Sequence, residues 1–125
     1  MTAQLNHTIV WCRDNLKSST FLASILRLPP PKPVFHFMVV ELGNGVAMDF
    51  MAKEGEVAPQ HYAFLVSDDE FDFGLERVRE TGQVYWADPG RTRPGKIYEH
   101  GGGRGFYFQD PDGHLLELLT KAEGI

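Results

Sequence analysis

The chain has 125 residues, of which 42% are hydrophobic and 23% are charged, and its formal net charge is −5. This size and composition are typical of one globular domain with a sizeable core, and the acidic charge argues against nucleic acid or an anionic membrane as partner. Cys12 is the single cysteine, which excludes a disulfide framework and a cysteine metal cage, and we expect it to be a small buried thiol. No apolar run reaches the length of a membrane span and the N-terminus is unlike a signal peptide, so the expected location is the cytoplasm.

The first half of the chain predicts a strand, a helix and a β-hairpin. Asp14 can cap a helix over residues 16–28, which three consecutive prolines end. Gly43-Asn44-Gly45 is a hairpin turn of the Asn-Gly kind. Strands are predicted from β-branched and aromatic content at residues 5–11, 34–42 and 46–51.

The second half repeats this order after a polar linker at residues 53–59. Ser67-Asp68-Asp69 supplies a cap for a helix over residues 70–81. Residues 88–103 form a long polar loop rich in Gly, Pro and Arg. Asp110-Pro111-Asp112-Gly113 has the composition of a tight turn, after which we expect His114 to be exposed. Strands are predicted at residues 61–66, 83–87, 104–109 and 114–120.

The two halves also match at fixed offsets, which indicates an internal repeat. Each half has a histidine near the start of its first strand, a capping aspartate seven residues later, and a carboxylate four residues after a turn glycine. These residues are His7, Asp14, Gly45 and Asp49 in the first half and His61, Asp68, Gly113 and Glu117 in the second. The sequence therefore predicts a single domain of two β-α-β-β(-β) modules, about residues 5–52 and 60–120.

One carboxylate, Glu117, stands among four leucines in the last predicted strand. A charge in that setting is unfavourable unless it is paired or bound to a metal. Side chains alternate between the two faces of a strand, so helices packed on one face would turn the histidines and acids of both halves toward a cavity on the other. Two imidazoles with one carboxylate suit a divalent transition metal and leave positions open for substrate and O₂. The same residues with a bound water would suit a Lewis-acid metal.

The chain resembles the vicinal oxygen chelate (glyoxalase, bleomycin-resistance and extradiol dioxygenase) superfamily over residues 5–119. The stretches that carry the resemblance are LNHTIVW with His7, Asp14 at the helix start, HYAFLVSD with His61, and the ending GRGFYFQDPDGHLLELLT. The resemblance implies an α+β fold in which two βαβββ modules form a cupped, open mixed sheet with helices on the convex face. It also implies His7, His61 and Glu117 as metal ligands. Relatives with a fourth ligand have Glu where this chain has the shorter Asp49, which favours three ligands and leaves Asp49 as a ligand, a base or a polar wall residue.

Within the superfamily the sequence is most similar to small dioxygenases of chartreusin-type aromatic polyketide biosynthesis. This similarity implies an oxidoreductase that cleaves or rearranges a polycyclic o-quinone or catechol, with Fe(II) as the first candidate metal and Mn, Ni or Zn as alternatives. It also raises reduced flavin, supplied from outside, as an oxygen activator, and the sequence has no dinucleotide fingerprint of its own. The alternatives are a glyoxalase-like isomerase or thiol transferase on the same metal site, and a non-catalytic drug-binding resistance protein.

Further residues are assigned from their positions around the expected cavity. An apolar pocket suits a flat aromatic ligand, and loop 88–103 is a candidate lid with a glycine hinge at residues 101–103. The expected substrate contacts are Trp11, His36, Met51, Leu65, Arg91, Tyr98 and Arg104, and the expected catalytic or proton-transfer residues are Asp49, His100 and Tyr107. The resemblance implies a homodimer in which exchanged modules would draw His7 and Glu117 from different protomers. The other expected partners are a small aromatic substrate and O₂.

Overall fold

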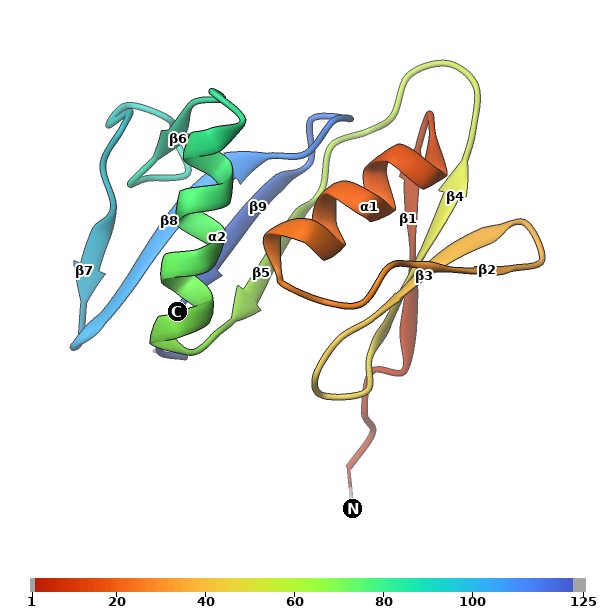
Figure 1. Cartoon of the computed structure of the whole chain (residues 1–125), viewed down its shortest axis with the longest axis horizontal. Helices are drawn as coiled ribbons and strands as arrows, with labels where there is room; N and C mark the ends of the chain where they lie inside the picture. The colour runs from red at the N-terminus through yellow and green to blue at the C-terminus, as the bar shows by residue number, and fades with distance from the viewer. Residues whose placement is uncertain (1, 123–125) are drawn as a thin grey trace.

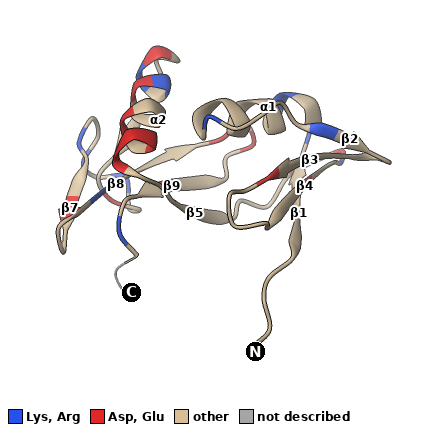
Figure 2. Cartoon of the chain, turned by 60° about the horizontal axis from the view of Figure 1, so that its bottom comes forward, with Lys and Arg blue, Asp and Glu red and all other residues tan. Residues whose placement is uncertain are grey.

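A computed structural model describes residues 2–122 of the chain as two βαβββ-like modules (Figure 1). Both helices lie on the same side of the strands, as Figure 2 shows from a second direction. The fold is therefore the predicted α+β arrangement with helices on one face. No helix in residues 2–122 is both long enough and apolar enough to cross a membrane.

The first module builds a four-stranded mixed sheet. Its strands are ordered β1-β4-β3-β2, with β1 parallel to β4 and the other pairs antiparallel. The chain order is β1 (His7–Cys12), α1 (Asn15–Ile25), β2 (Lys32–Val34), β3 (Phe37–Glu41) and β4 (Ala47–Ala52).

The second module repeats that plan with an extra short strand. The order in its sheet is β5-β9-β8-β6, with β5 parallel to β9, and β7 also pairs with β8. The chain order is β5 (His61–Leu65), α2 (Asp68–Glu80), β6 (Tyr85–Trp86), β7 (Tyr98–His100), β8 (Gly103–Gln109) and β9 (Leu115–Leu119). The strands β1 and β5, which begin with the two repeat histidines, are each the edge of their sheet.

Both helices begin at side-chain caps. Asp14 accepts a hydrogen bond from the N–H of Lys17, as the sequence predicts. In the second module Ser67, not Asp68, is the cap: Ser67 and Glu70 each bond the other's backbone N–H in a capping box. The prediction that Asp68 caps this helix was wrong. The Ser67 hydroxyl, one residue earlier, already accepts the hydrogen bond of the Glu70 N–H, which has no partner within the helix.

Strand alternation places one row of side chains of each sheet in the core. The buried row of the first module includes Val10, Cys12, Met48 and Phe50, and that of the second includes Phe64, Phe106, Phe108, Leu116 and Leu118. Helix α2 approaches this layer closely at Gly74, where an added Cβ would lie 2.6 Å from Leu118 Cδ1. Burial raises the pKa of the Cys12 thiol to about 12, which keeps it protonated and unreactive.

Two short strands differ from the sequence prediction. The single strand expected at residues 34–42 is broken at Phe35, whose φ of 53° turns the chain between β2 and β3. Strand β2 contains Pro33, which has no N–H to donate; an edge strand tolerates this because one of its sides has no neighbouring strand. The loop expected at residues 88–103 contains β7, which pairs with β8.

His114 joins the two modules and is 1% exposed, so the prediction of an exposed side chain was wrong. Its Nδ1 accepts a hydrogen bond from the N–H of Gln60 at 2.9 Å, and its Nε2 donates to the carbonyl of Trp11 at 2.8 Å. In the same turn Asp112 accepts hydrogen bonds from Arg13 N–H and the Ser18 hydroxyl. The turn between β8 and β9 therefore fastens the second module to the first.

Replacing His114 tests this junction. We expect His114→Phe to lower the free energy of unfolding by about 1–3 kcal/mol, because it fills the space but leaves the Gln60 N–H and the Trp11 carbonyl without their partner. Urea denaturation would measure the change. The matched control is His36→Gln on the exposed β2–β3 turn, with an expected change within about 0.5 kcal/mol; equal losses in both variants would contradict the assigned role.

Candidate active site

Glu117 lies on the sheet face that points away from the helices, yet it is only 8% exposed. Strand β9 places it between Ala63 of β5 and Tyr107 of β8, which are its register partners. Its partner Ala63 is small, and His61, Tyr98 and Tyr107 all interact with the carboxylate. The predicted charge among leucines is thus shielded from water by side chains of three strands.

His61 faces this carboxylate with its Nε2. Its Nδ1 lies 2.9 Å from the carbonyl oxygen of Leu115, which can only accept, so Nδ1 carries the proton. The other ring nitrogen, Nε2, lies 3.2 Å from Glu117 Oε1. In neutral His61 both atoms are acceptors, and a cation or a second proton between them removes the repulsion. A histidine fixed by a backbone carbonyl and set beside a carboxylate is the usual form of two protein ligands to a divalent transition metal.

Two phenols complete the second-module half of the site. The Tyr98 hydroxyl donates to Glu117 Oε2 at 2.5 Å. The Tyr107 ring lies between its neighbours, with its centroid 5.9 Å from that of His61 and 6.0 Å from that of Tyr98. Burial and the Glu117 charge raise the pKa of Tyr107 to about 12, so the phenol remains a hydrogen-bond donor at neutral pH.

In the first module, the predicted site residues lie on the face of the sheet that points away from the helices. His7, Ile9 and Trp11 alternate with the buried row of β1, and Asp49 and Met51 share their face through the β1–β4 register. His7 is exposed, with Nδ1 2.8 Å from Asn6 Oδ1. In residues 2–122 no group of three His, Cys, Asp or Glu side chains lies close enough to hold a metal. The structure of one chain therefore brings His61 and Glu117 together but does not bring His7 or Asp49 to them.

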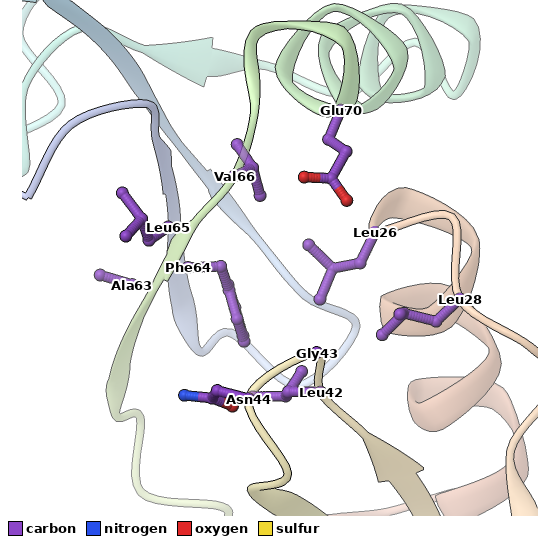
Figure 3. A pocket seen from close by; sticks show the side chains of 10 residues that line it. All are labelled: Leu26, Leu28, Leu42, Gly43, Asn44, Ala63, Phe64, Leu65, Val66 and Glu70. Atoms are coloured by element: carbon purple, nitrogen blue, oxygen red, sulfur yellow. The ribbon is translucent and has the colours of Figure 1, made fainter.

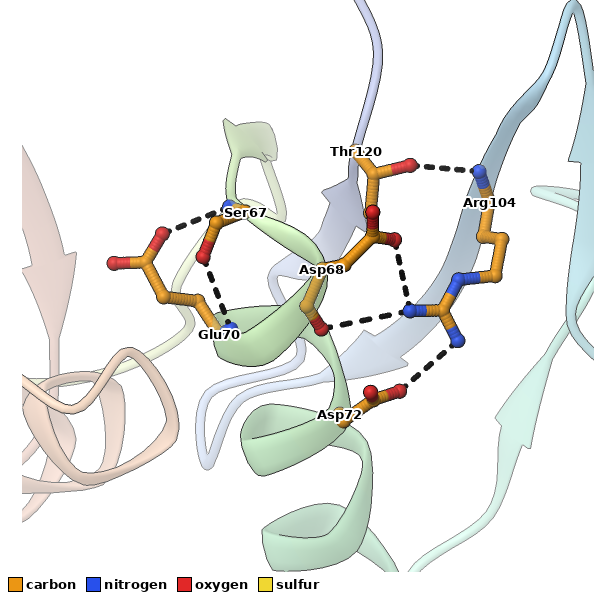
Figure 4. A network of polar contacts seen from close by, with 6 residues as sticks. All are labelled: Ser67, Asp68, Glu70, Asp72, Arg104 and Thr120. Carbon is orange, nitrogen blue, oxygen red and sulfur yellow. Dashed lines mark hydrogen bonds and ion pairs between the residues drawn. The ribbon is translucent and has the colours of Figure 1, made fainter.

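Arg104 lies on the helix face of β8, opposite Glu117. Its guanidinium pairs with Asp68 at 3.0 Å and Asp72 at 2.9 Å (Figure 4) and stacks 4.2 Å from the centroid of the Phe71 ring. From the sequence we expected Arg104 to contact substrate. The alternation of side chains along β8 instead places Arg104 and Tyr107 on opposite faces of the sheet. It fastens α2 to the sheet and has no access to the face that carries His61.

The remaining sequence candidates lie at the margins of the molecule. Leu65 is exposed on the same face of β5 as His61, and His100 is exposed at the end of β7. Arg91 stacks on Trp86 in the loop before β7, and His36 is exposed at the β2–β3 turn. None of these four has a contact with Glu117 or His61 in the described residues.

A second feature is a cavity of about 360 Å³ that lies along β5 and is lined by neither His61 nor Glu117 (Figure 3). It opens between the end of α1, the β3–β4 turn and the start of α2. Its walls are Leu26, Leu28, Leu42, Gly43, Asn44, Ala63, Phe64, Leu65, Val66 and Glu70. The one carboxylate in this wall, Glu70, is already bonded to the N–H of Ser67 in the capping box.

Sequence reasoning missed Gly105 as a site residue. It is paired with Tyr98 across β7 and β8, and the Tyr98 ring lies directly over it. A glycine inside a predicted strand is itself the signal that another group approaches closely. The partner was not identifiable, because β7 had been assigned to a loop.

A profile of the Glyoxalase/Bleomycin resistance protein/Dioxygenase superfamily matches residues 4–118, and the chain belongs to this superfamily. Among solved structures, oxidase ChaP-H1 matches with a TM-score of 0.96 at 55% identity, over 99% of this chain and 100% of ChaP-H1. Oxidase ChaP-H2 matches with a TM-score of 0.95 at 53% identity, over 99% of this chain and 98% of its own. Glutathione transferase FosA of Serratia marcescens is 30% identical over 124 residues, 94% of this chain and 81% of FosA. The predicted superfamily and fold are confirmed, and the similarity to two oxidases supports an oxidoreductase.

Variants of Arg104 and Glu117, compared in stability and in metal affinity, test the placement of Arg104 on the helix face. We expect Arg104→Gln to lower the free energy of unfolding by about 1 kcal/mol, because it removes the contacts to Asp68, Asp72 and Phe71. We expect no change in metal affinity, whereas Glu117→Gln should abolish metal binding. Urea denaturation and calorimetric titration with Co(II) would measure the two effects. Equal weakening of Co(II) binding by both variants would contradict the separation of faces.

Proposed function

We propose that the protein is a metal-dependent dioxygenase that uses O₂ to cleave or rearrange a polycyclic aromatic polyketide in antibiotic biosynthesis. The substrate would present vicinal oxygens, as an o-quinone or a catechol does. The observation that carries the proposal is the 3.2 Å distance between His61 Nε2 and Glu117 Oε1, in a chain 55% identical to an oxidase over almost its whole length.

The protein's own groups have distinct parts in this proposal. A divalent metal, Fe(II) as the first candidate, would be held by His61 and Glu117 and would supply a Lewis-acid and redox centre for O₂ and the vicinal oxygens. The Tyr107 phenol, protonated at neutral pH, is placed beside His61 to donate a hydrogen bond to a substrate oxygen. Trp11 and Leu65, 45% and 62% exposed, offer an apolar surface for flat rings. Asp49 is the candidate proton acceptor on the first sheet.

A second copy of the chain would supply the third ligand, His7. The histidines begin β1 and β5, and both strands are sheet edges whose backbone groups can pair with another chain. Large apolar side chains, Ile9, Trp11 and Leu65, are exposed on the faces that carry the ligands. Pairing edge to edge in a two-fold dimer would cover these residues and bring His7 of one protomer to His61 and Glu117 of the other.

Oxygen dependence tests the proposed reaction. We expect Fe(II)-loaded protein to convert a polycyclic catechol or o-quinone in air and not under anaerobic conditions, with product formation followed by mass spectrometry. A parallel reaction with added reduced flavin separates activation at the metal from activation outside the protein. Glu117→Gln should reduce conversion at least about 100-fold, because it removes the anionic ligand. Undiminished conversion without O₂ would eliminate the oxygenase.

Mixing two inactive variants tests the shared site. His7→Ala and His61→Ala protomers, unfolded and refolded together, would form hybrid dimers in which one site has all its ligands. About half of the dimers are hybrids and each regains one of two sites, so we expect about a quarter of wild-type activity in the mixture. Each variant refolded alone is the control. No recovery in the mixture, with hybrid dimers present by native mass spectrometry, would mean that all three ligands come from one chain.

A second candidate function is thiol transfer, which the 30% identity to glutathione transferase FosA favours. It would use the same His61 and Glu117 with a different metal and a thiol cosubstrate. Conversion of an electrophilic substrate that requires glutathione and proceeds without O₂ would select this function over the oxygenase.

A further inference from the structure

The two oxygens of Glu117 have different partners. Oε1 faces His61 Nε2 at 3.2 Å, on the side where a metal would bind. Oε2 accepts a hydrogen bond from the Tyr98 hydroxyl at 2.5 Å, a short distance for a charge-assisted bond. The carboxylate therefore has Oε2 bonded to Tyr98 and Oε1 directed to His61, with the Tyr107 phenol also against it.

The backbone of β7 and β8 allows the Tyr98 phenol to reach Glu117. Tyr98 comes from β7, a three-residue strand at the margin of the sheet. To reach Glu117 on β9 its ring must cross β8, and it does so over Gly105. A Cβ added at Gly105 would overlap Cζ, Cε2 and Oη of Tyr98, so any other residue there would exclude the ring from its place.

The Tyr98 hydroxyl is the donor of this hydrogen bond, because an ionised carboxylate can only accept. A phenolate would place a second anion against the carboxylate, and the buried setting disfavours it. In the hydrogen bond between the two side chains, Tyr98 is therefore always the donor and Glu117 always the acceptor.

We propose that Tyr98 is a positioning residue that occupies Oε2 of Glu117 and thereby presents Oε1 alone to the metal. This inference rests on the proposed metal site and adds to it an assignment for β7 and Gly105. Partners that orient a ligating carboxylate contribute strongly to metal affinity. Without Tyr98 the carboxylate is free to rotate or to bind through both oxygens, which changes the coordination as well as the affinity.

Titration of the metal-free protein with Co(II) tests the assignment, using chelator competition for affinity and the visible absorption bands for coordination. We expect Tyr98→Phe to weaken Co(II) binding about 10–100-fold and to alter the bands. Gly105→Ala should reproduce both changes although the phenol is still present. The matched control is Tyr85→Phe, the same chemical change on β6 where the hydroxyl accepts from Arg79, with wild-type affinity and bands expected.

The outcomes separate the positioning role from the metal site itself. Wild-type protein that binds Co(II), together with Tyr98→Phe that binds it within twofold and with unchanged bands, would overturn the positioning role alone. Wild-type protein that binds no Co(II) would overturn the metal site, and both proposals with it. Urea denaturation of each metal-free variant distinguishes lost folding from lost coordination, because the positioning role predicts a spectral change in a chain that still folds cooperatively.

Discussion

The second module is arranged around a carboxylate that is 8% exposed on a strand of leucines. An isolated charge in that position is strongly unfavourable, so each neighbouring element contributes a group that compensates it. The parallel partner β5 supplies a histidine and, directly opposite Glu117, the small Ala63. Strand β7 supplies a phenol, and β8 leaves the space for it at Gly105. The sheet order brings β5, β9 and β8 side by side and the marginal strand β7 adds a phenol, so that together they satisfy one anion.

Much of this architecture is encoded in local sequence. The alternation of the strands and the helix caps depend on neighbouring residues, so the two modules and their faces follow from the sequence. Strands β2 and β7 have three residues each and too few positions to show a period. His114 resembles a turn residue because the groups it bonds are 54 and 103 positions away in the chain. Long-range hydrogen bonds of this kind leave no local pattern.

In the candidate site too, some features follow from local sequence and others depend on contacts between distant residues. The repeat predicts His61 and Glu117 from equal spacing, and the structure brings them into contact. His7 belongs to the other sheet, and its distance from the pair depends on how copies of the chain assemble, which the sequence of one chain does not encode. Arg104 and Tyr107 are three residues apart on one strand, so they point to opposite faces. The parity of β8 was not evident from the sequence, and Arg104 was placed with the substrate for that reason.

The turn at residues 110–114 sets which side of β9 each residue occupies. A strand's faces alternate with every residue, so adding or deleting one position there would turn Glu117 toward the core and a leucine toward the face that carries His61. The same turn carries His114 and Asp112, which bind the first module. The loop between β6 and β7 has its own hydrogen bonds, from Thr92 and Arg93 to Asp88, but its length does not set the register of β8 against β9. During divergence of this sequence, a change of one residue in length is therefore expected to be eliminated at the final turn more strictly than in the loop between β6 and β7.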